Sequence, residues 1–183
     1  MWTKEELDRY ARHIVLPGVG GAGQARLKQS SVLVVGAGGL GSPVLMYLAA
    51  AGVGRLGIVE MDLVDLSNLQ RQVLFDTQAL GLPKAEAAKA RLASLNPHVQ
   101  VEIHAHKLDS QNALSIIAPY DLVLDCTDNF PTRYLLNDAC VLLNKPLVYG
   151  AIHQFEGQLS VFHHQAGPCY RCLFLRPSQP GTV

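Results

Sequence analysis

The residues with the clearest capacity for chemistry are six consecutive positions rich in glycine. Gly36, Gly38 and Gly41 satisfy the pattern G-x-G-x-x-G, and Gly39 adds a further glycine. Such a turn needs glycine because its backbone angles are unusual and because a phosphate must approach the main chain closely. The start of a following helix favours the same anion through its free N–H groups and its positive dipole end. The motif predicts an adenine-nucleotide site and leaves open whether the nucleotide is NAD or ATP.

An acidic residue and a polar loop follow the glycine turn. Glu60 lies 19 residues beyond Gly41, at the predicted end of the second strand, where a carboxylate can accept hydrogen bonds from ribose hydroxyls. A plain dinucleotide fold would turn into its next helix here, whereas this chain reaches its next helix only at Lys84. The candidate nucleotide contacts in the intervening loop are Asp62, Ser67, Asn68, Gln70 and Arg71.

Charged residues on either side of this loop favour ATP over NAD. Arg71 and Lys84 supply two cations, and Asp125 and Asp128 place two carboxylates after a later strand, at the edge of a crevice. A triphosphate needs cations and a metal to spread its charge, and Arg, Lys and an aspartate-bound Mg²⁺ meet that need. Taken singly, each cation is also compatible with an ordinary surface position, and Asp128 with a helix cap. Together, beside a glycine turn, they favour ATP.

A cysteine pair near the end of the sequence predicts half of a metal site. Cys169 and Cys172 form C-x-x-C, the spacing typical of structural zinc. His163 and His164 are weak additional ligands, because they fall on a predicted strand whose successive residues face opposite ways. A redox pair or two unligated thiols is the alternative.

The remaining cysteines and histidines show no catalytic pattern. Cys126 and Cys140 fit buried packing positions better than nucleophiles, and we expect His104 and His106 at the surface. Four cysteines in a chain of 183 residues indicate a reducing compartment, for which we expect the cytoplasm. The first residues also lack the basic and then apolar order of a secretory signal.

The elements that must position these residues alternate between strand and helix. A helix capped by Thr3 and Glu6, a glycine-rich loop to Gly23 and a short helix at 24–29 are expected first. Strands are then expected at 32–35, 56–60, 99–105, 121–125, 146–151 and 158–163, and helices at 42–51, 83–95, 108–117 and 130–143. This order predicts a Rossmann-like, doubly wound α/β fold: a mainly parallel sheet, helices on both faces, and a ligand crevice at the carboxyl ends of the strands.

We expect one domain over residues 1–183. It divides into an N-terminal helical segment at 1–30, a Rossmann-like core at 31–165, and the truncated start of a zinc and crossover region at 166–183, which includes a predicted loop over 176–183.

Composition excludes several classes of protein. Hydrophobic residues make up 49% and charged residues 16%, which excludes a disordered chain and a coiled coil. Fifteen basic and fifteen acidic residues give no net charge, so nothing pulls the whole chain toward nucleic acid or an anionic membrane. The stretch between Lys28 and Arg55 carries no charge and is long enough to span a bilayer. Its glycines and Pro43 favour a strand, a turn and a helix instead.

The combined motifs resemble the ubiquitin-activating-type adenylyltransferases, whose bacterial ThiF, MoeB and HesA branch activates sulfur-carrier proteins for thiamine or molybdopterin synthesis. The resemblance extends over residues 4–175. The motifs that carry it are the glycine turn, Ser67–Arg71, Lys84, Asp125–Asn129 and Cys169–Cys172. It implies an ATP- and Mg²⁺-dependent enzyme that adenylates the C-terminal Gly-Gly carboxylate of a ubiquitin-like sulfur carrier and releases pyrophosphate.

The resemblance also implies roles for individual residues. Asp128 would hold Mg²⁺, and Arg12 would reach the phosphates from the partner subunit of a homodimer. The acid on the ribose is often aspartate in this family, whereas Glu60 stands here. A second C-x-x-C, later in the chain, would complete a zinc site with Cys169 and Cys172, and a later cysteine serves a thioester or acyl-disulfide step in some members. The residues implied around ATP are Gly39, Glu60, Asn68, Arg71, Lys84, Asp128 and Asn129.

A carboxylate is already ionised at pH 7, so this reaction needs no general base. The obstacle is electrostatic, and Arg71, Lys84, Arg12 and a metal on Asp128 would lower it. Three alternatives compete: an NAD-dependent oxidoreductase, a non-catalytic subunit of the same fold, and a branch that activates a modified tRNA base. An oxidoreductase would have no use for the polar loop, and a non-catalytic subunit would not need Arg71, Lys84 and Asp128. The neutral overall charge weakens the tRNA-activating alternative.

Overall fold

The computed structural model describes residues 2–175, and its centre is a six-stranded sheet in the order β3-β2-β1-β4-β5-β6. The strands are β1 Ser31–Val35, β2 Arg55–Val59, β3 Gln100–His104, β4 Leu122–Asp125, β5 Leu147–His153 and β6 Glu156–Phe162. All neighbours are parallel except β5 and β6, which form an antiparallel pair. This confirms the predicted Rossmann-like, doubly wound and mainly parallel sheet.

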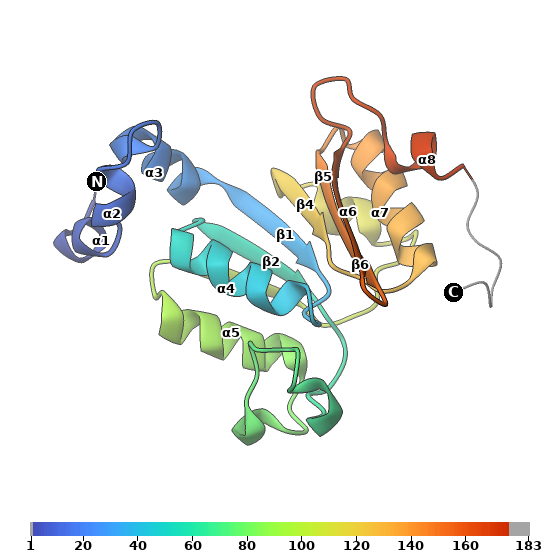
Figure 1. Cartoon of the computed structure of the whole chain (residues 1–183), viewed down its shortest axis with the longest axis horizontal. Helices are drawn as coiled ribbons and strands as arrows, with labels where there is room; N and C mark the ends of the chain where they lie inside the picture. Colours follow the sequence, from blue (N-terminus) through green and yellow to red (C-terminus); the bar gives the residue numbers. More distant parts are fainter. Residues whose placement is uncertain (1, 176–183) are drawn as a thin grey trace.

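Helices cover both faces of the sheet (Figure 1). Leu45 of α4 and Leu92 of α5 belong to the core on one face, and Ile117 of α6 and Leu136 of α7 to the core on the other. The α-helices are α1 Lys4–Arg9, α2 Ala11–Ile14, α3 Gly20–Gln29, α4 Gly41–Ala51, α5 Lys84–Leu95, α6 Ala113–Ile117, α7 Phe130–Leu142 and α8 Tyr170–Leu173, and the 3₁₀ turns are η1 Leu66–Asn68 and η2 Thr77–Ala79. The central strand β1 is apolar and buried from Val32 to Val35 because both faces of the sheet are covered there.

Most predicted elements differ from the structure by a few residues at their ends, and two differ by more. The glycine stretch expected to be a loop is helical from Gly20, because Gln24 is fully buried and donates a hydrogen bond to the carbonyl of Ala51 at 2.8 Å. Tertiary contact here overrides the weak helix propensity of glycine. The helix expected at 108–117 begins only at Ala113, because the carboxylate of Asp109 accepts from the N–H groups of Gln111 and Asn112 in a turn.

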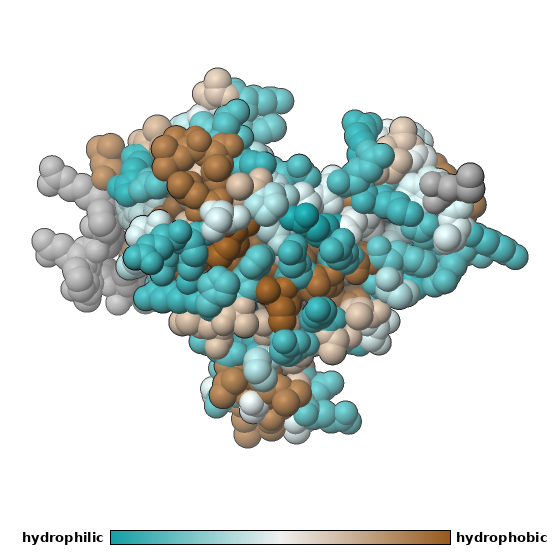
Figure 2. Space-filling model, turned by 180° about the vertical axis from the view of Figure 1, so that it is seen from behind, coloured by the Kyte–Doolittle hydropathy of each residue, from teal (hydrophilic) through white to brown (hydrophobic). Residues whose placement is uncertain are grey.

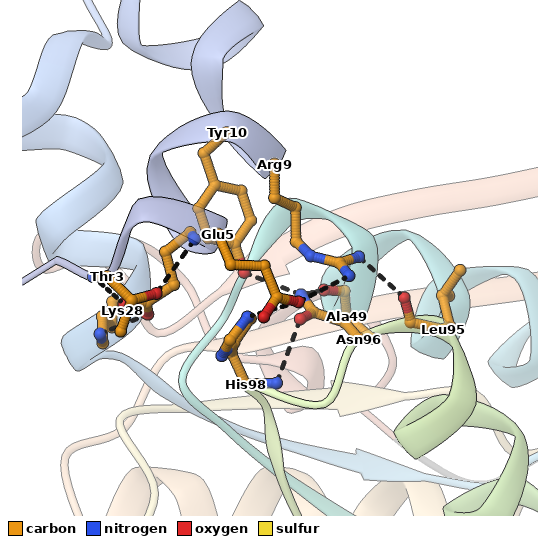
Figure 3. A network of polar contacts seen from close by, with 10 residues as sticks. Thr3, Glu5, Arg9, Tyr10, Lys28, Ala49, Leu95, Asn96 and His98 are labelled. Carbon is orange, nitrogen blue, oxygen red and sulfur yellow. Dashed lines mark hydrogen bonds and ion pairs between the residues drawn. The ribbon is translucent and has the colours of Figure 1, made fainter.

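The opening helix is broken at Tyr10, and the resulting α1 packs on the core (Figure 3). The predicted capping box of Thr3 and Glu6 is present. Glu6 is buried and pairs with Lys28 of α3, and this hydrogen bond, with that from Thr3, lowers the pKa of Glu6 to about 2. Tyr10 is buried against the core, where its hydroxyl accepts from Asn96 at 2.8 Å.

The charge-free stretch between Lys28 and Arg55 contains the last residue of α3 and then β1, the glycine turn and α4, which confirms the predicted strand, turn and helix. None of the helices within residues 2–175 has both the length and the apolar character needed to cross a membrane. Apolar residues also appear on the projecting lobe at the lower end of Figure 2, formed by the segment between β2 and α5. Exposed members of this lobe are Leu63, Leu66, Val73 and Leu82.

Candidate nucleotide-binding site

A cavity of about 550 Å³ lies at the carboxyl ends of β1, β2 and β4. Parallel strands that end at one edge bring their following loops together there. Nine of the predicted nucleotide contacts line this cavity, from five separate segments of the chain: Gly36, Gly38, Gly39, Glu60, Asp62, Arg71, Lys84, Asp128 and Asn129.

The glycines of the turn have two different structural reasons. A Cβ on Gly41 would lie 1.9 Å from the carbonyl oxygen of Gly36, and Gly36 itself has φ +93°. These two glycines are required by the turn alone. A Cβ on Gly38 or Gly39 would meet only side-chain atoms, at 3.7 Å and 3.5 Å, so the packing of the turn does not demand glycine there. Both line the cavity and leave the main chain open to a ligand.

Glu60 ties the end of β2 to the glycine turn. Its Oε2 accepts from the N–H of Ala37 at 2.9 Å, and its Oε1 accepts from the N–H groups of Met61 and Asp62 at 2.8 and 2.9 Å. A carboxylate has about four acceptor positions, so roughly one remains, on Oε2, for a ribose hydroxyl. The residue therefore shapes the turn as well as lining the cavity.

The two predicted cations line the cavity at different depths. Lys84, at the start of α5, is only 4% exposed, and its Nζ lies 3.4 Å from Oδ2 of the exposed Asp62. A buried ammonium needs an anionic partner, and Asp62 supplies one from the solvent-exposed side. Arg71 is exposed and lies over Gly39, and its Nη1 donates to the carbonyl of Ser67 at 3.2 Å.

The two carboxylates after β4 do not both face the crevice, contrary to the sequence-based expectation. Asp125 is 1% exposed, and its Oδ1 accepts from the N–H and hydroxyl of Thr127 at 2.9 and 2.7 Å. Burial raises the pKa of Asp125. Asp128 is exposed at the cavity and makes no hydrogen bond or ion pair with any residue in 2–175. The helix-cap role belongs to Asn129, whose side chain accepts from the N–H of Thr132 at 3.0 Å.

Five predicted contacts lie outside the cavity lining. Gly41 is inside the turn, and Ser67 bonds to Asp65 at the start of η1. Arg12 is exposed on α2 and is not part of the cavity within this single chain. The other two are Asn68 and Gln70, although the Gln70 side chain accepts from Arg71 at 3.3 Å.

The cavity also contains residues that sequence reasoning missed. Gln72 is buried, and Arg133, 9% exposed, lines the wall beside Thr127. His106 and Lys107 come from the loop after β3. The rule that ligands bind beyond the carboxyl ends of parallel strands would have indicated His106 and Lys107. Arg133 lies one helical turn after the Asn129 cap, which places it at the same edge of the sheet.

The C-x-x-C pair is held by α7. The two Sγ atoms of Cys169 and Cys172 lie 3.6 Å apart, close to the roughly 3.8 Å separation of two thiolates on a tetrahedral zinc ion. Cys169 caps the short helix α8, whose Tyr170 N–H donates to Asn137 of α7 at 2.7 Å. Burial raises the pKa of Cys169, but hydrogen bonds from Cys172 and neighbouring amides outweigh it and lower the pKa overall. Across residues 2–175 no cluster of three or more metal-ligating side chains exists, so this pair would supply at most two of the four ligands of a structural zinc site.

The other cysteines are packing residues. Burial raises the pKa of both Cys126 and Cys140 to about 12. His163 follows the end of β6 and bonds to Asn144, so it does not continue the strand as expected. His104 is half-buried and hydrogen-bonded to a tyrosine hydroxyl at 3.1 Å, which corrects its predicted surface position, whereas His106 is exposed. The loop expected at 176–183 lies outside the described residues.

Known proteins resemble this chain over nearly all of its length. The ThiF family model matches residues 10–183. A sulfur carrier protein adenylyltransferase of Thermus thermophilus is 64% identical over 187 residues, which cover 100% of this chain and 69% of that protein. An adenylyltransferase and sulfurtransferase MOCS3 of Anopheles gambiae is 52% identical over 99% of this chain, which spans only 41% of that relative. Among solved structures, MccB of E. coli with MccA-N7isoASN has a TM-score of 0.82 at 26% identity, covering 93% of this chain and 52% of that one.

The fold, the cavity and these relatives define an α/β adenylyltransferase domain. The chain belongs to the ThiF family.

Proposed function

We propose that this chain adenylates the C-terminal Gly-Gly carboxylate of a ubiquitin-like sulfur-carrier protein with ATP and releases pyrophosphate. The observation that carries the proposal is the cavity itself, where Arg71, the buried Lys84 and the open main chain of Gly39 converge with the unpaired carboxylate of Asp128. This combination suits a triphosphate and has no use in hydride transfer. The names of the relatives agree with it.

The reaction follows from the charges in the cavity. A carboxylate oxygen of the carrier forms a bond to the α-phosphorus, and the bond from that phosphorus to the bridging oxygen breaks to release pyrophosphate. No proton is transferred, because the attacking carboxylate is ionised at neutral pH. The barrier is the approach of an anion to a polyanion, and Arg71 and Lys84 lower it by neutralising the phosphates. The main-chain N–H groups of the glycine turn hold the nucleotide in position.

Asp128 fits the role of a magnesium ligand. Mg²⁺ at phosphate sites is typically held by one or two carboxylates together with substrate phosphates and water, and Asp128 offers an exposed carboxylate with no competing partner within residues 2–175. When bound, the metal would neutralise charge that develops on the pyrophosphate. Asp62 is paired with Lys84 and Glu60 accepts from three main-chain N–H groups, whereas Asp128 has no such partner within residues 2–175.

The finer assignments belong to the same proposal. We place the protein in the cytoplasm, as a homodimer whose Arg12 reaches the partner's phosphates. The exposed position of Arg12 supports this role, because its side chain makes no hydrogen bond or ion pair with any residue in 2–175. Cys169 and Cys172 would hold structural zinc with two further ligands from outside the described residues. Thiamine and molybdenum cofactor synthesis both fit the carrier class.

The test is ATP–pyrophosphate exchange with Asp128→Ala, using Asp8→Ala, an exposed carboxylate on α1, as the matched control. We expect exchange to fall by at least about 10²-fold in Asp128→Ala, the typical loss when a transition-state charge partner is removed. The control should keep wild-type exchange, and both variants should melt like the wild type. Wild-type exchange in Asp128→Ala would refute the metal role. Absence of exchange in the wild type with every candidate carrier would refute the adenylation.

A further inference from the structure

Arg133 of α7 is a buried cation in the cavity wall that forms no ion pair with any carboxylate in residues 2–175. Its Nη2 donates to the carbonyl oxygen of Thr127 at 3.1 Å, and its Nη1 donates to the hydroxyl of Tyr149 at 3.3 Å. The guanidinium centre lies 5.3 Å from each of two ring centroids, those of Phe130 and Tyr149. The geometry therefore commits both ends of its planar fork to neutral partners.

The carbonyl that Arg133 holds immediately precedes Asp128. The N–H of the same residue, Thr127, donates to the buried carboxylate of Asp125 at 2.9 Å. Thr127 is thus clamped by an anion on its N–H and by a cation on its carbonyl. Rotation of the peptide unit that leads into Asp128 would break the second contact. Asp128 has no side-chain hydrogen bond or ion pair of its own within residues 2–175, so the contacts on Thr127 fix the main chain from which its carboxylate extends.

The clamp continues away from the cavity. The hydroxyl of Tyr149 on β5 donates to Oε1 of Gln158 on β6 at 3.2 Å. Two polar atoms of the cluster, Oδ2 of Asp125 and Nε of Arg133, are buried without a hydrogen-bond partner. Unsatisfied buried polar atoms are costly, and they persist where the surrounding arrangement serves another purpose.

We propose that Arg133 is a positioning residue that sets the Asp128 carboxylate for the metal of a bound nucleotide, an inference that rests on the proposed ATP-dependent function. Its role is geometric, because the guanidinium must reach the Thr127 carbonyl and the Tyr149 hydroxyl at the same time. A lysine keeps the charge but has no planar fork to span both acceptors. Charge alone and geometry therefore give different outcomes when Arg133 is replaced by lysine.

The experiment measures how strongly the metal improves nucleotide binding. ATP is titrated calorimetrically into the whole protein, once with Mg²⁺ and once with excess EDTA. The metal contribution is the dissociation constant in EDTA divided by the dissociation constant in Mg²⁺. We expect Arg133→Met and Arg133→Lys each to lower this ratio by about tenfold, since displacements of about 1 Å weaken positioned interactions on that scale or more. Tyr149→Phe, which removes one contact of the fork, should lower it by a smaller factor.

The matched control is Arg55→Met. Arg55 likewise lies over an aromatic ring, 4.4 Å from the centroid of Tyr120, and donates to a backbone carbonyl, that of Pro119, at 3.0 Å. It begins β2, at the opposite end of the strand from the cavity, and is absent from the cavity lining. Its replacement should leave the metal contribution unchanged.

Each outcome supports or overturns the proposal. A wild-type ratio in Arg133→Lys would show that charge alone acts, and an equal loss in Arg55→Met would show general destabilisation. Both results overturn the positioning role. If Arg133→Met does not fold, Arg133→Lys and Tyr149→Phe decide the question in its place. A wild type that binds ATP equally with and without Mg²⁺ removes the metal site and the positioning role together, whereas pyrophosphate exchange still judges the adenylation separately.

Discussion

Replacing Gly41 by alanine should damage the fold rather than the ligand site alone. The new Cβ would lie 1.9 Å from the carbonyl oxygen of Gly36, whereas ordinary contacts begin near 3.4 Å, so the turn must shift by about 1.5 Å. The overlap is between the new Cβ and a main-chain carbonyl oxygen, so no flexible side chain can move to relieve it. We expect the free energy of unfolding to fall by about 3 kcal/mol, which is at the upper end of overpacking costs. For a domain of this size, such a loss lowers the Tm by about 6–12 °C.

Gly39→Ala is the matched variant because the same methyl group has room there. Its Cβ would meet Cδ of Arg71 at 3.5 Å, an ordinary contact, so we expect stability to change by less than about 0.5 kcal/mol. Its methyl group would stand where a phosphate approaches the main chain, and ATP affinity should fall by about tenfold, or about 1.4 kcal/mol.

Thermal denaturation and calorimetric ATP titration of both variants measure the two effects separately. The reasoning is refuted if Gly41→Ala melts within about 2 °C of the wild type. It is equally refuted if Gly39→Ala binds ATP like the wild type.

Two further predictions concern ionisation. The pKa of Glu6, about 2, lies below its ordinary value of 4.5. The ionised Glu6 therefore stabilises the folded state fully above pH 4.5, and this stabilisation is lost as the pH falls toward 2. Urea denaturation should show Glu6→Gln less stable by about 1–2 kcal/mol at pH 7, after allowance for solvent screening of the pair, with the difference vanishing near pH 2. Cys126 and Cys140, whose pKa is about 12, have a thiolate fraction of about 10⁻⁴ at pH 8. Mass spectrometry of chelator-treated native protein should find alkylation at Cys169 and Cys172 first, and early labelling of Cys140 would contradict its burial.

Local patterns predicted most of the fold. The apolar run at β1, the glycine turn and the Gly52 that ends α4 each depend on backbone angles or burial over a few residues. The bounds failed where distant contacts override propensity. The helix at Gly20 depends on Gln24 being buried against the end of α4, which no pattern around residue 20 contains.

The candidate site was predictable in part for the same reason. Arg71, Lys84 and Asp128 follow strand ends or begin helices, so the rule that ligands bind beyond the carboxyl ends of parallel strands places them together. The rule does not say which carboxylate after β4 faces outward. The family resemblance assigned Mg²⁺ to Asp128, and the packed structure shows that Asp125 is buried as a partner of Thr127.

The sequence by itself determined the alternation of strands and helices, the nucleotide-type turn and the set of residues able to handle a triphosphate, because spacing and residue type are properties of short segments. Only the tertiary structure decided where the side chains of those residues lie relative to one another. The strand order β2-β1-β4 brings Lys84 and Asp128 to one cavity, and the packing of α7 against β5 buries Arg133 beside the Thr127 carbonyl. This placement depends on contacts between residues distant in sequence, which local spacing does not encode.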